Sequence, residues 1–150
     1  MTRSQKLSTI VVGVDGSPSS EQALRWAAQQ AHLTGGELHA VISWALPTAY
    51  GWGVPLEYDW QDNARSIFGK TLDETLDEIE AARVHRHVIE GHPARALLDA
   101  AYADLLVVGS RGHGGFSGML LGSVSQHVIA HAPCPVVVIP RDAAPDASAA

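Results

Sequence analysis

Residues 104–125 read DLLVVGSRGHGGFSGMLLGSVS, a short apolar run that passes directly into a glycine-rich segment. The apolar run at 104–109 is typical of a buried strand, and residues 123–132 are typical of a helix. Glycine lets backbone amides approach a ligand with no Cβ in the way, and the first turn of the next helix adds unpaired amides at the positive end of a dipole. The stretch therefore predicts a strand–loop–helix unit that holds an anion, such as a phosphate, beyond the strand.

Strand and helix patterns alternate along the chain, which predicts an α/β fold. We expect one domain built as a three-layer sandwich, with helices on both faces of a five-stranded, mostly parallel sheet. Because right-handed crossovers place the carboxyl ends of parallel strands on one edge, a ligand should bind at that edge, where the strand order reverses. The expected strands are 7–14, 37–43, 83–91, 104–109 and 134–140, and the expected helices are 18–34, 64–79, 93–103 and 123–132.

Composition and charge limit the classes of function. The chain has 150 residues, of which 46% are hydrophobic, and a formal net charge of −6. Nucleic acid or an anionic membrane would require a basic surface, so we expect neither as a partner. The single cysteine, Cys134, cannot close an internal disulfide, and the N-terminus does not resemble a signal peptide, which favours a cytoplasmic location. Residues 1–141 are expected to form the domain, followed by a disordered tail at 142–150.

Three better-known phosphate-binding patterns do not fit. Gly69-Lys70-Thr71 resembles the end of a P-loop, but position 64 is alanine and the triplet lies inside an expected helix. A Rossmann fingerprint that starts at Gly112 fails at Ser117, where a glycine is required. A receiver domain needs several neighbouring carboxylates, whereas Asp15 is the one acidic residue that follows the expected first strand.

The spacing Gly109-x2-Gly112-x9-Gly122-Ser123 resembles the nucleotide-binding motif of the universal stress protein family. The segments IVVGVDGSPSSEQALRWA at 10–27, GHPARALLDAA at 91–101 and HAPCPVVVIP at 131–140 are similar to that family as well. The resemblance covers residues 7–140 and implies a Rossmann-like, adenine nucleotide alpha hydrolase-like fold with strand order 3-2-1-4-5. It also implies an ATP-binding, homodimeric protein of stress response or signalling, in which ATP binds with or without Mg²⁺.

The resemblance assigns parts of the nucleotide to particular residues. It places the adenine near the ends of the first two strands, Asp15 at the ribose or at a metal carried by ATP, and the phosphates along the glycine segment. The nucleotide-binding residues predicted in this way are Gly13, Val14, Asp15, Ala40, Val108, Gly109, Ser110, Arg111, Gly112, His113, Gly114, Gly115, Gly122, Ser123, Val124 and Ser125. The predicted dimer edge is the last strand, at Val136, Val137, Val138 and Ile139.

The residues favour a nucleotide-binding module over an efficient ATPase. ATP hydrolysis needs a general base and charge neutralisation at the γ-phosphate, and only Asp15 and Arg111 suggest any of these parts. Two alternatives stay open. One is a slow ATP hydrolase or nucleotidyl-type enzyme, whose multiple turnovers would be lost in Asp15→Ala, and the other is a flavodoxin-like redox module. No catalytic residue is assigned.

Two histidine pairs have a spacing that suits a metal ion, namely His127 with His131 on a helix and His85 with His87 on one face of a strand. Neither pair has a third ligand in a recognisable pattern, so no protein metal site is predicted. Cys134, between two prolines, is expected to be structural rather than nucleophilic.

Residues 44–60, WALPTAYGWGVPLEYDW, interrupt the alternation and contain most of the aromatic residues. Prolines and glycines in this stretch predict a loop. The aromatic side chains are compatible with an adenine lid, with a partner surface or with a cover for the sheet edge, and the sequence does not separate these three roles.

Overall fold

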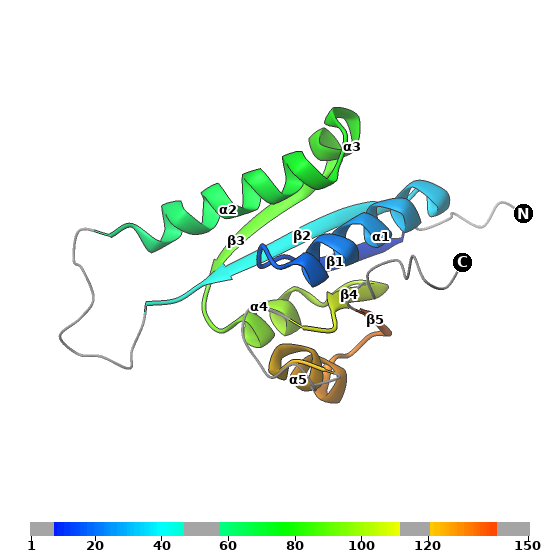
Figure 1. The fold of residues 1–150 in the computed structure, drawn as a ribbon. Helices are drawn as coiled ribbons and strands as arrows, with labels where there is room; N and C mark the ends of the chain where they lie inside the picture. The colour runs from blue at the N-terminus through cyan, green and yellow to red at the C-terminus, as the bar shows by residue number, and fades with distance from the viewer. Residues whose placement is uncertain (1–7, 47–57, 112–120, 141–150) are drawn as a thin grey trace, which may run out of the picture.

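A five-stranded sheet forms the middle layer of the molecule, and all of its neighbouring strands are parallel (Figure 1). The computed structural model describes residues 8–46, 58–111 and 121–140. The strand order is β3-β2-β1-β4-β5, which confirms the predicted order and makes β3 and β5 the two edges. The strands are β1 (Thr9–Gly13), β2 (Glu37–Trp44), β3 (His85–Glu90), β4 (Leu105–Gly109) and β5 (Val136–Ile139).

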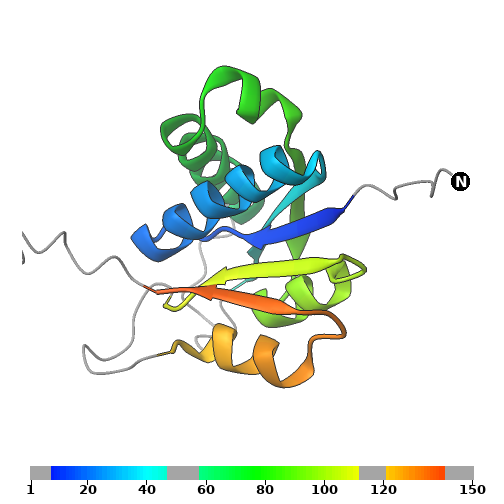
Figure 2. The same cartoon turned by 90° about the vertical axis from the view of Figure 1, so that its right-hand side faces the viewer.

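Helices cover both faces of this sheet, as predicted (Figure 2). On one face α1 packs on β1 and β4, and α2 packs on β2 and β3. On the other face α4 packs on β1 and β2, and α5 packs on β5. Each face has its own apolar core, with Leu24 and Phe68 on the first and Leu97 and Leu106 on the second. The helices are α1 (Pro18–Thr34), α2 (Trp60–Thr75), α3 (Glu78–Arg83), α4 (Pro93–Ala100) and α5 (Ser123–His131).

Local sequence signals explain the first unit of the fold. The middle of β1 is buried on both faces, which a parallel strand in the centre of a sheet requires. Ser17 caps α1 by accepting a hydrogen bond from the amide of Ser20, and Pro18 occupies the first turn. The helix ends at Gly35, whose φ of 68° is left-handed and suits glycine. The predicted bounds of this helix are confirmed.

The single helix expected at 64–79 is wrong. The structure has α2, which already begins at Trp60, and a separate short helix α3. The break lies at Leu76 and Asp77, which have extended backbones, and Asp77 forms a capping box with Glu80. As a result Ile79 is 67% exposed and does not continue the buried face of α2.

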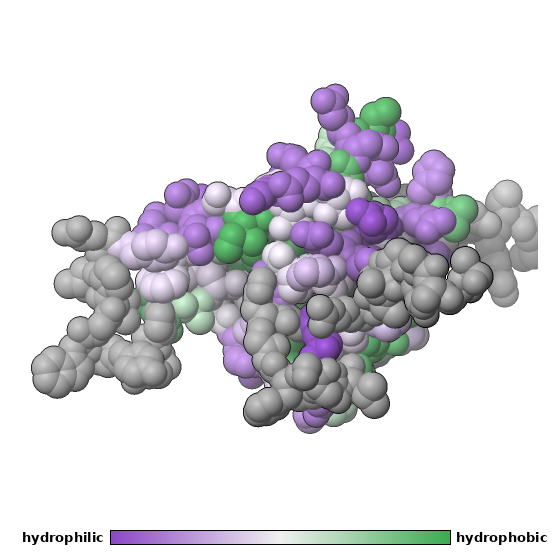
Figure 3. All heavy atoms as spheres, viewed as in Figure 1, coloured by the Kyte–Doolittle hydropathy of each residue, from purple (hydrophilic) through white to green (hydrophobic). Residues whose placement is uncertain are grey.

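The chain segments at 1–7, 47–57, 112–120 and 141–150 lie outside the described residues, so most of the aromatic stretch and the predicted tail do too. Of the aromatic stretch, Trp44 ends β2 and Trp60 begins α2. On the face drawn in Figure 3, most of the coloured surface above the helices is hydrophilic, and the hydrophobic residues on it are scattered. Among the described helices none has the length and hydropathy that a bilayer span requires.

Candidate functional site

The carboxyl ends of β1 and β4 lie side by side in the centre of the sheet, and the chain leaves them toward opposite faces. After β1 it enters α1, whereas after β4 it continues toward α5 on the other face. This arrangement is the topological switch point at which open α/β sheets bind their ligands. The reversal of strand order, at which the sequence predicted a ligand-binding crevice, therefore lies between β1 and β4.

A cavity of ≈ 130 Å³ opens at this switch point. Its walls combine an apolar part, formed by valine and leucine side chains, with a polar part that contains Asp15, Arg111 and three serines. Such a combination suits a ligand with a flat apolar ring at one end and charged or hydroxyl groups at the other. The lining residues are Gly13, Val14, Asp15, Ser20, Val41, Ser43, Pro93, Leu97, Val108, Gly109, Arg111, Val124 and Ser125.

A network of serines fixes the β1 side of the crevice. Asp15 Oδ1 accepts a hydrogen bond from the amide of Ser17 at 2.8 Å, which forms a turn at the start of α1. The Ser20 hydroxyl accepts from the Asp15 amide at 3.2 Å and donates to the carbonyl of Ser17 at 3.1 Å. Gly16, between them, has a φ of 81°, which a glycine adopts without strain. The Asp15 backbone and carboxylate are thus held in place beside the cavity.

The β4 side is fixed to the β1 side by close backbone approach. A Cβ built on Gly109 would lie 2.8 Å from the carbonyl carbon and oxygen of Ser19, so glycine is required at this strand end. The hydroxyl of Ser19 accepts a hydrogen bond from the Arg111 amide at 3.3 Å. The buried Ser125 hydroxyl donates to the Gly109 carbonyl at 2.6 Å and so ties the first turn of α5 to the end of β4.

The two ends of the glycine segment meet at one point. The Gly122 amide donates to the Ser110 carbonyl at 2.6 Å, and the Ser110 amide donates to the Ile139 carbonyl at 2.8 Å. The two described flanks of the glycine segment are therefore joined by one hydrogen bond at the crevice. Gly112, His113, Gly114 and Gly115, which the sequence assigned to the site, lie outside the described residues.

The N-terminus of α5 differs from those of the other four described helices because its N-cap residue, Gly122, makes no side-chain hydrogen bond to the first turn. The caps of the others are Ser17, Asp59, Asp77 and His92. By helix geometry the amides of Ser123, Val124 and Ser125 lack acceptors inside the helix. Two of these residues, Val124 and Ser125, line the cavity. An uncapped helix start beside a cavity offers amide donors and a positive dipole end to an anion.

The structure brings together most of the predicted residues that it describes. Gly13, Val14 and Asp15 meet Val108, Gly109, Arg111, Val124 and Ser125 around one cavity. Gly122 and Ser123 start α5 beside it. Ser110 is buried and holds the loop ends, and Ala40 lies in the core that faces α1 and α2. The β2 residues that line the cavity are Val41, which follows Ala40, and Ser43.

Five lining residues are absent from the predicted set: Ser20, Val41, Ser43, Pro93 and Leu97. Leu97 approaches so closely that a Cβ on Gly13 would lie 3.0 Å from its Cδ1. The connection from β3 to β4 must cross β2 and β1, so the chain order itself indicates that the helix after β3 covers this edge. For Ser20, the signal was its place in the first turn of the helix that follows Asp15.

Two features singled out in the sequence, a Gly-Lys-Thr triplet and the cysteine, do not line the cavity. Gly69-Lys70-Thr71 lies inside α2, as expected, and Thr71 donates to the Ile67 carbonyl of the same helix at 2.8 Å. Burial raises the pKa of the Cys134 thiol, and the nearby charge of Asp104 adds to the effect. A thiol with a raised pKa is a poor nucleophile, which supports the structural role predicted for Cys134.

Comparison with protein families places these features in a known group. The model of the universal stress protein family matches residues 6–140 of the chain. The chain belongs to that family. A universal stress protein of Mycolicibacterium smegmatis is 38% identical over 134 residues, which are 87% of this chain and 45% of the relative. The chain thus spans about half the length of the universal stress proteins that it matches in sequence.

Solved structures share both the fold and the family. A universal stress protein in complex with cAMP is 28% identical, with a TM-score of 0.63 over 88% of this chain and 95% of that one. The universal stress protein of Archaeoglobus fulgidus in complex with dAMP is also 28% identical, with a TM-score of 0.61 over 89% of this chain and 98% of that one. The five-stranded parallel sheet in the order 3-2-1-4-5 is therefore the Rossmann-like fold of universal stress proteins.

Proposed function

We propose that the crevice between β1 and β4 binds ATP or another adenine nucleotide, and that the protein is a nucleotide-dependent stress-response or signalling module. The uncapped start of α5 beside the cavity carries this proposal, because a nucleotide phosphate is the kind of anion that such amides bind. Structures of two family members in complex with cAMP and dAMP support an adenine nucleotide.

The chemistry of the walls matches the parts of the nucleotide. Val14, Val41 and Leu97 supply apolar surface for the adenine ring, and Asp15 supplies an acceptor for ribose hydroxyls. Arg111 lines the same cavity together with Val124 and Ser125 of the first turn of α5, and its guanidinium and the amides of that turn suit the phosphates. Among the described lining residues Asp15 alone is acidic, so it is the residue that would contact an Mg²⁺ ion carried by ATP.

The nucleotide content of the purified protein tests the proposal. The protein is denatured, and anion-exchange chromatography of the supernatant identifies any nucleotide that has copurified. Calorimetric titration of the emptied protein with ATP, AMP and cAMP then gives the affinity and the preference among phosphate groups. Binding of at least one of these nucleotides is the expected result. A folded, empty protein that binds none of the three contradicts the proposal.

The Asp15→Asn variant is expected to lower ATP affinity about tenfold, because a hydrogen bond to a carboxylate is worth about 1.4 kcal/mol more than one to an amide. The asparagine oxygen still accepts from the Ser17 amide, a bond of 2.8 Å in the parent, so the free energy of unfolding should change by less than about 0.5 kcal/mol. Calorimetry and thermal unfolding measure the two quantities.

Glu21→Gln is the matched control for that variant. It removes a carboxylate from the first turn of α1, close in sequence to Asp15, at a residue that does not line the cavity. Its ATP affinity should equal that of the parent. An equal loss in the two variants would contradict a specific contact between Asp15 and the nucleotide.

We also propose that two chains pair through β5. This strand is an edge of the sheet, and all four of its residues are partly exposed although they are valine or isoleucine. Val136 and Val138 pack on one core and Val137 and Ile139 on the other, so apolar side chains reach the edge on both faces. An apolar edge strand of this kind is a template for pairing with another strand.

Sedimentation velocity is expected to give twice the chain mass of 15.9 kDa for the parent protein. Val138→Lys should give the single-chain mass, because a charged residue on an edge strand opposes pairing. Leu33→Lys, at an exposed apolar residue of α1, adds the same charge elsewhere and should leave the mass unchanged. A parent protein with the single-chain mass overturns the pairing.

A further inference from the structure

Four polar side chains gather on the β2 and β3 half of the sheet, and none of them lines the nucleotide crevice: Glu37, His39, His85 and His87. The sequence identified only His85 and His87 and found no third ligand for them. The third and fourth groups come from β2, because the strand register places His39 beside His85 and Val41 beside His87. This pairing joins segments that are far apart in the chain.

These side chains share one face of the sheet. Alternate residues of a strand point to the same face, so Glu37, His39 and Val41 lie together, and Val41 belongs to the core beneath α4. The imidazole of His39 lies nearly parallel to two others, with ring centroids 4.4 Å from His85 and 5.2 Å from His87. Helix α4 covers β1 and β2, which leaves the side chains of Glu37 and His85 exposed near the β3 edge.

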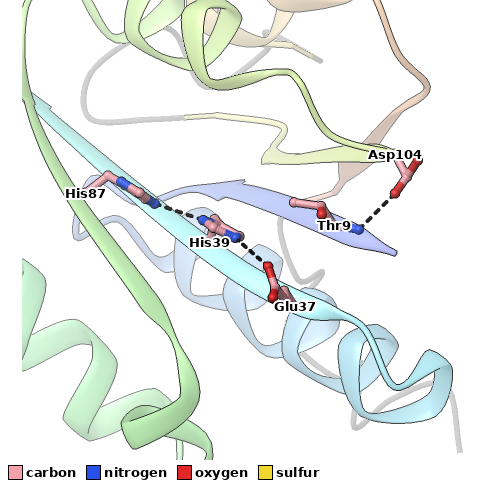
Figure 4. A network of polar contacts seen from close by, with 5 residues as sticks. All are labelled: Thr9, Glu37, His39, His87 and Asp104. Carbon is pink, nitrogen blue, oxygen red and sulfur yellow. Dashed lines mark hydrogen bonds and ion pairs between the residues drawn. The ribbon is translucent and has the colours of Figure 1, made fainter. Parts of the chain in front are cut away.

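His39 is held at both ring nitrogens. Its Nδ1 lies 2.9 Å from Nε2 of His87, and its Nε2 lies 3.2 Å from Oε2 of Glu37 (Figure 4). In one pair of tautomers, His87 donates a hydrogen bond through Nε2 to His39 Nδ1, and His39 donates through Nε2 to Glu37. In the other pair His39 donates through Nδ1 to His87, and the lone pair on Nε2 then faces the carboxylate oxygen. A cation between these two atoms would remove the repulsion of the second arrangement.

We propose that Glu37, His39 and His85 bind a divalent transition metal ion of the Zn²⁺ class. One nitrogen or oxygen atom of each side chain lies within 4.8 Å of the others. Bonds of about 2.0–2.1 Å in a tetrahedral site set neighbouring ligand atoms about 3.3 Å apart, and the His39–Glu37 pair already has 3.2 Å. His85 is exposed, so a turn of its ring out of the stack closes the remaining distance.

His87 acts as the positioning residue of this site. A histidine that binds metal through one nitrogen donates its other N–H to a fixed acceptor, which sets the tautomer and the ring orientation. The contact of 2.9 Å between His39 Nδ1 and His87 Nε2 provides such an acceptor.

The site is open to solvent on one side. Glu37 and His85 also border a broad hollow of ≈ 760 Å³, together with Asp77, Glu80 and Arg83 of the α3 region. Three protein ligands leave a fourth position of a tetrahedral ion for water, and the exposure of Glu37 and His85 gives solvent access to it. The hollow lies at the beginning of β2 and β3, whereas the nucleotide crevice is at the carboxyl ends of the strands.

Titration with ZnCl₂ tests this site, using the nucleotide-free protein without a polyhistidine tag at pH 7.5. Equilibrium dialysis and competition with a chromophoric chelator give the stoichiometry and the affinity. We expect one tight Zn²⁺ per chain, and at least a tenfold loss of affinity in His39→Ala and in Glu37→Gln. The second variant changes one exposed side chain and keeps the test valid if His39→Ala misfolds.

His87→Ala should weaken Zn²⁺ binding about tenfold or more. His87→Gln, whose amide oxygen accepts the His39 N–H, should restore most of the affinity.

The double variant His127→Ala/His131→Ala is the matched control. These residues form the other histidine pair, one turn apart on α5 with ring centroids 4.7 Å apart, and the described part of the chain gives them no third ligand. The control should bind Zn²⁺ as the parent does. The proposal is overturned if the parent binds no Zn²⁺, if His39→Ala and Glu37→Gln bind as well as the parent, or if only the control loses affinity.

Discussion

Gly109→Ala is expected to lower the free energy of unfolding by about 3 kcal/mol, the upper part of the range for an overpacked core. The new Cβ would lie 2.6 Å from the Ser19 hydroxyl oxygen and 2.8 Å from the backbone of the same residue. Backbone atoms at the start of α1 cannot turn aside as a flexible side chain would, so the helix must move away from β4. At roughly 2–4 °C per kcal/mol for a chain of this size, the melting temperature should fall by about 6–12 °C.

Two other glycines provide a graded comparison within the same chain. Gly69→Ala, inside α2, meets no atom within 4 Å and should raise the free energy of unfolding by about 1 kcal/mol, because alanine favours a helix interior. Gly13→Ala meets only the tip of the Leu97 side chain at 3.0 Å, so its effect should lie between the other two. A Gly109→Ala variant as stable as the parent would contradict the close packing of β4 on α1.

Much of the fold was predictable because its signals are local. Apolar runs identified the central strands β1 and β4, and Ser17, Pro18 and Gly35 marked both ends of α1. The helix break at Asp77 was missed although the sequence contains its signal, an aspartate three residues before Glu80. Leu72 and Leu76 suggested a continuing helical period that also fits Ile79, and this apolar spacing concealed the capping box.

The candidate site was predictable to the extent that it consists of strand ends and helix starts. Gly109 and Ser125 were predicted from the glycine segment that follows a strand, Asp15 was predicted from the family resemblance, and all three line the cavity. Leu97 was not identified because its place depends on how α4 crosses the sheet, and that crossing is a property of the packed structure. For the same reason the meeting of His39 with His85 could not be predicted, since it depends on the register between β2 and β3.

Gly122→Asp is expected to weaken nucleotide binding at least 100-fold while the fold persists. Gly122 has φ −73° and ψ 166°, close to the values of −75° and 155° at the capping residue Ser17, so an aspartate can adopt the same capping conformation. Its carboxylate would accept from the first-turn amides of α5, which in our proposal bind phosphate, and would repel the phosphate as well. Loss of one or two hydrogen bonds to a charged group costs about 1.5–3 kcal/mol each, which gives the expected factor.

Gly122→Asn separates occupancy of the amides from charge. Asparagine caps a helix about as well as aspartate. The free energy of unfolding of each variant should therefore differ from that of the parent by less than about 1 kcal/mol. Only aspartate adds a negative charge, so the asparagine variant should lose about tenfold in affinity for ATP and the aspartate variant at least tenfold more. Calorimetric titration with ATP and thermal unfolding of the three proteins make the comparison. Because adenosine lacks phosphates, the affinity for adenosine should be equal in all three proteins. An aspartate variant that binds ATP as tightly as the parent would place the phosphates away from α5.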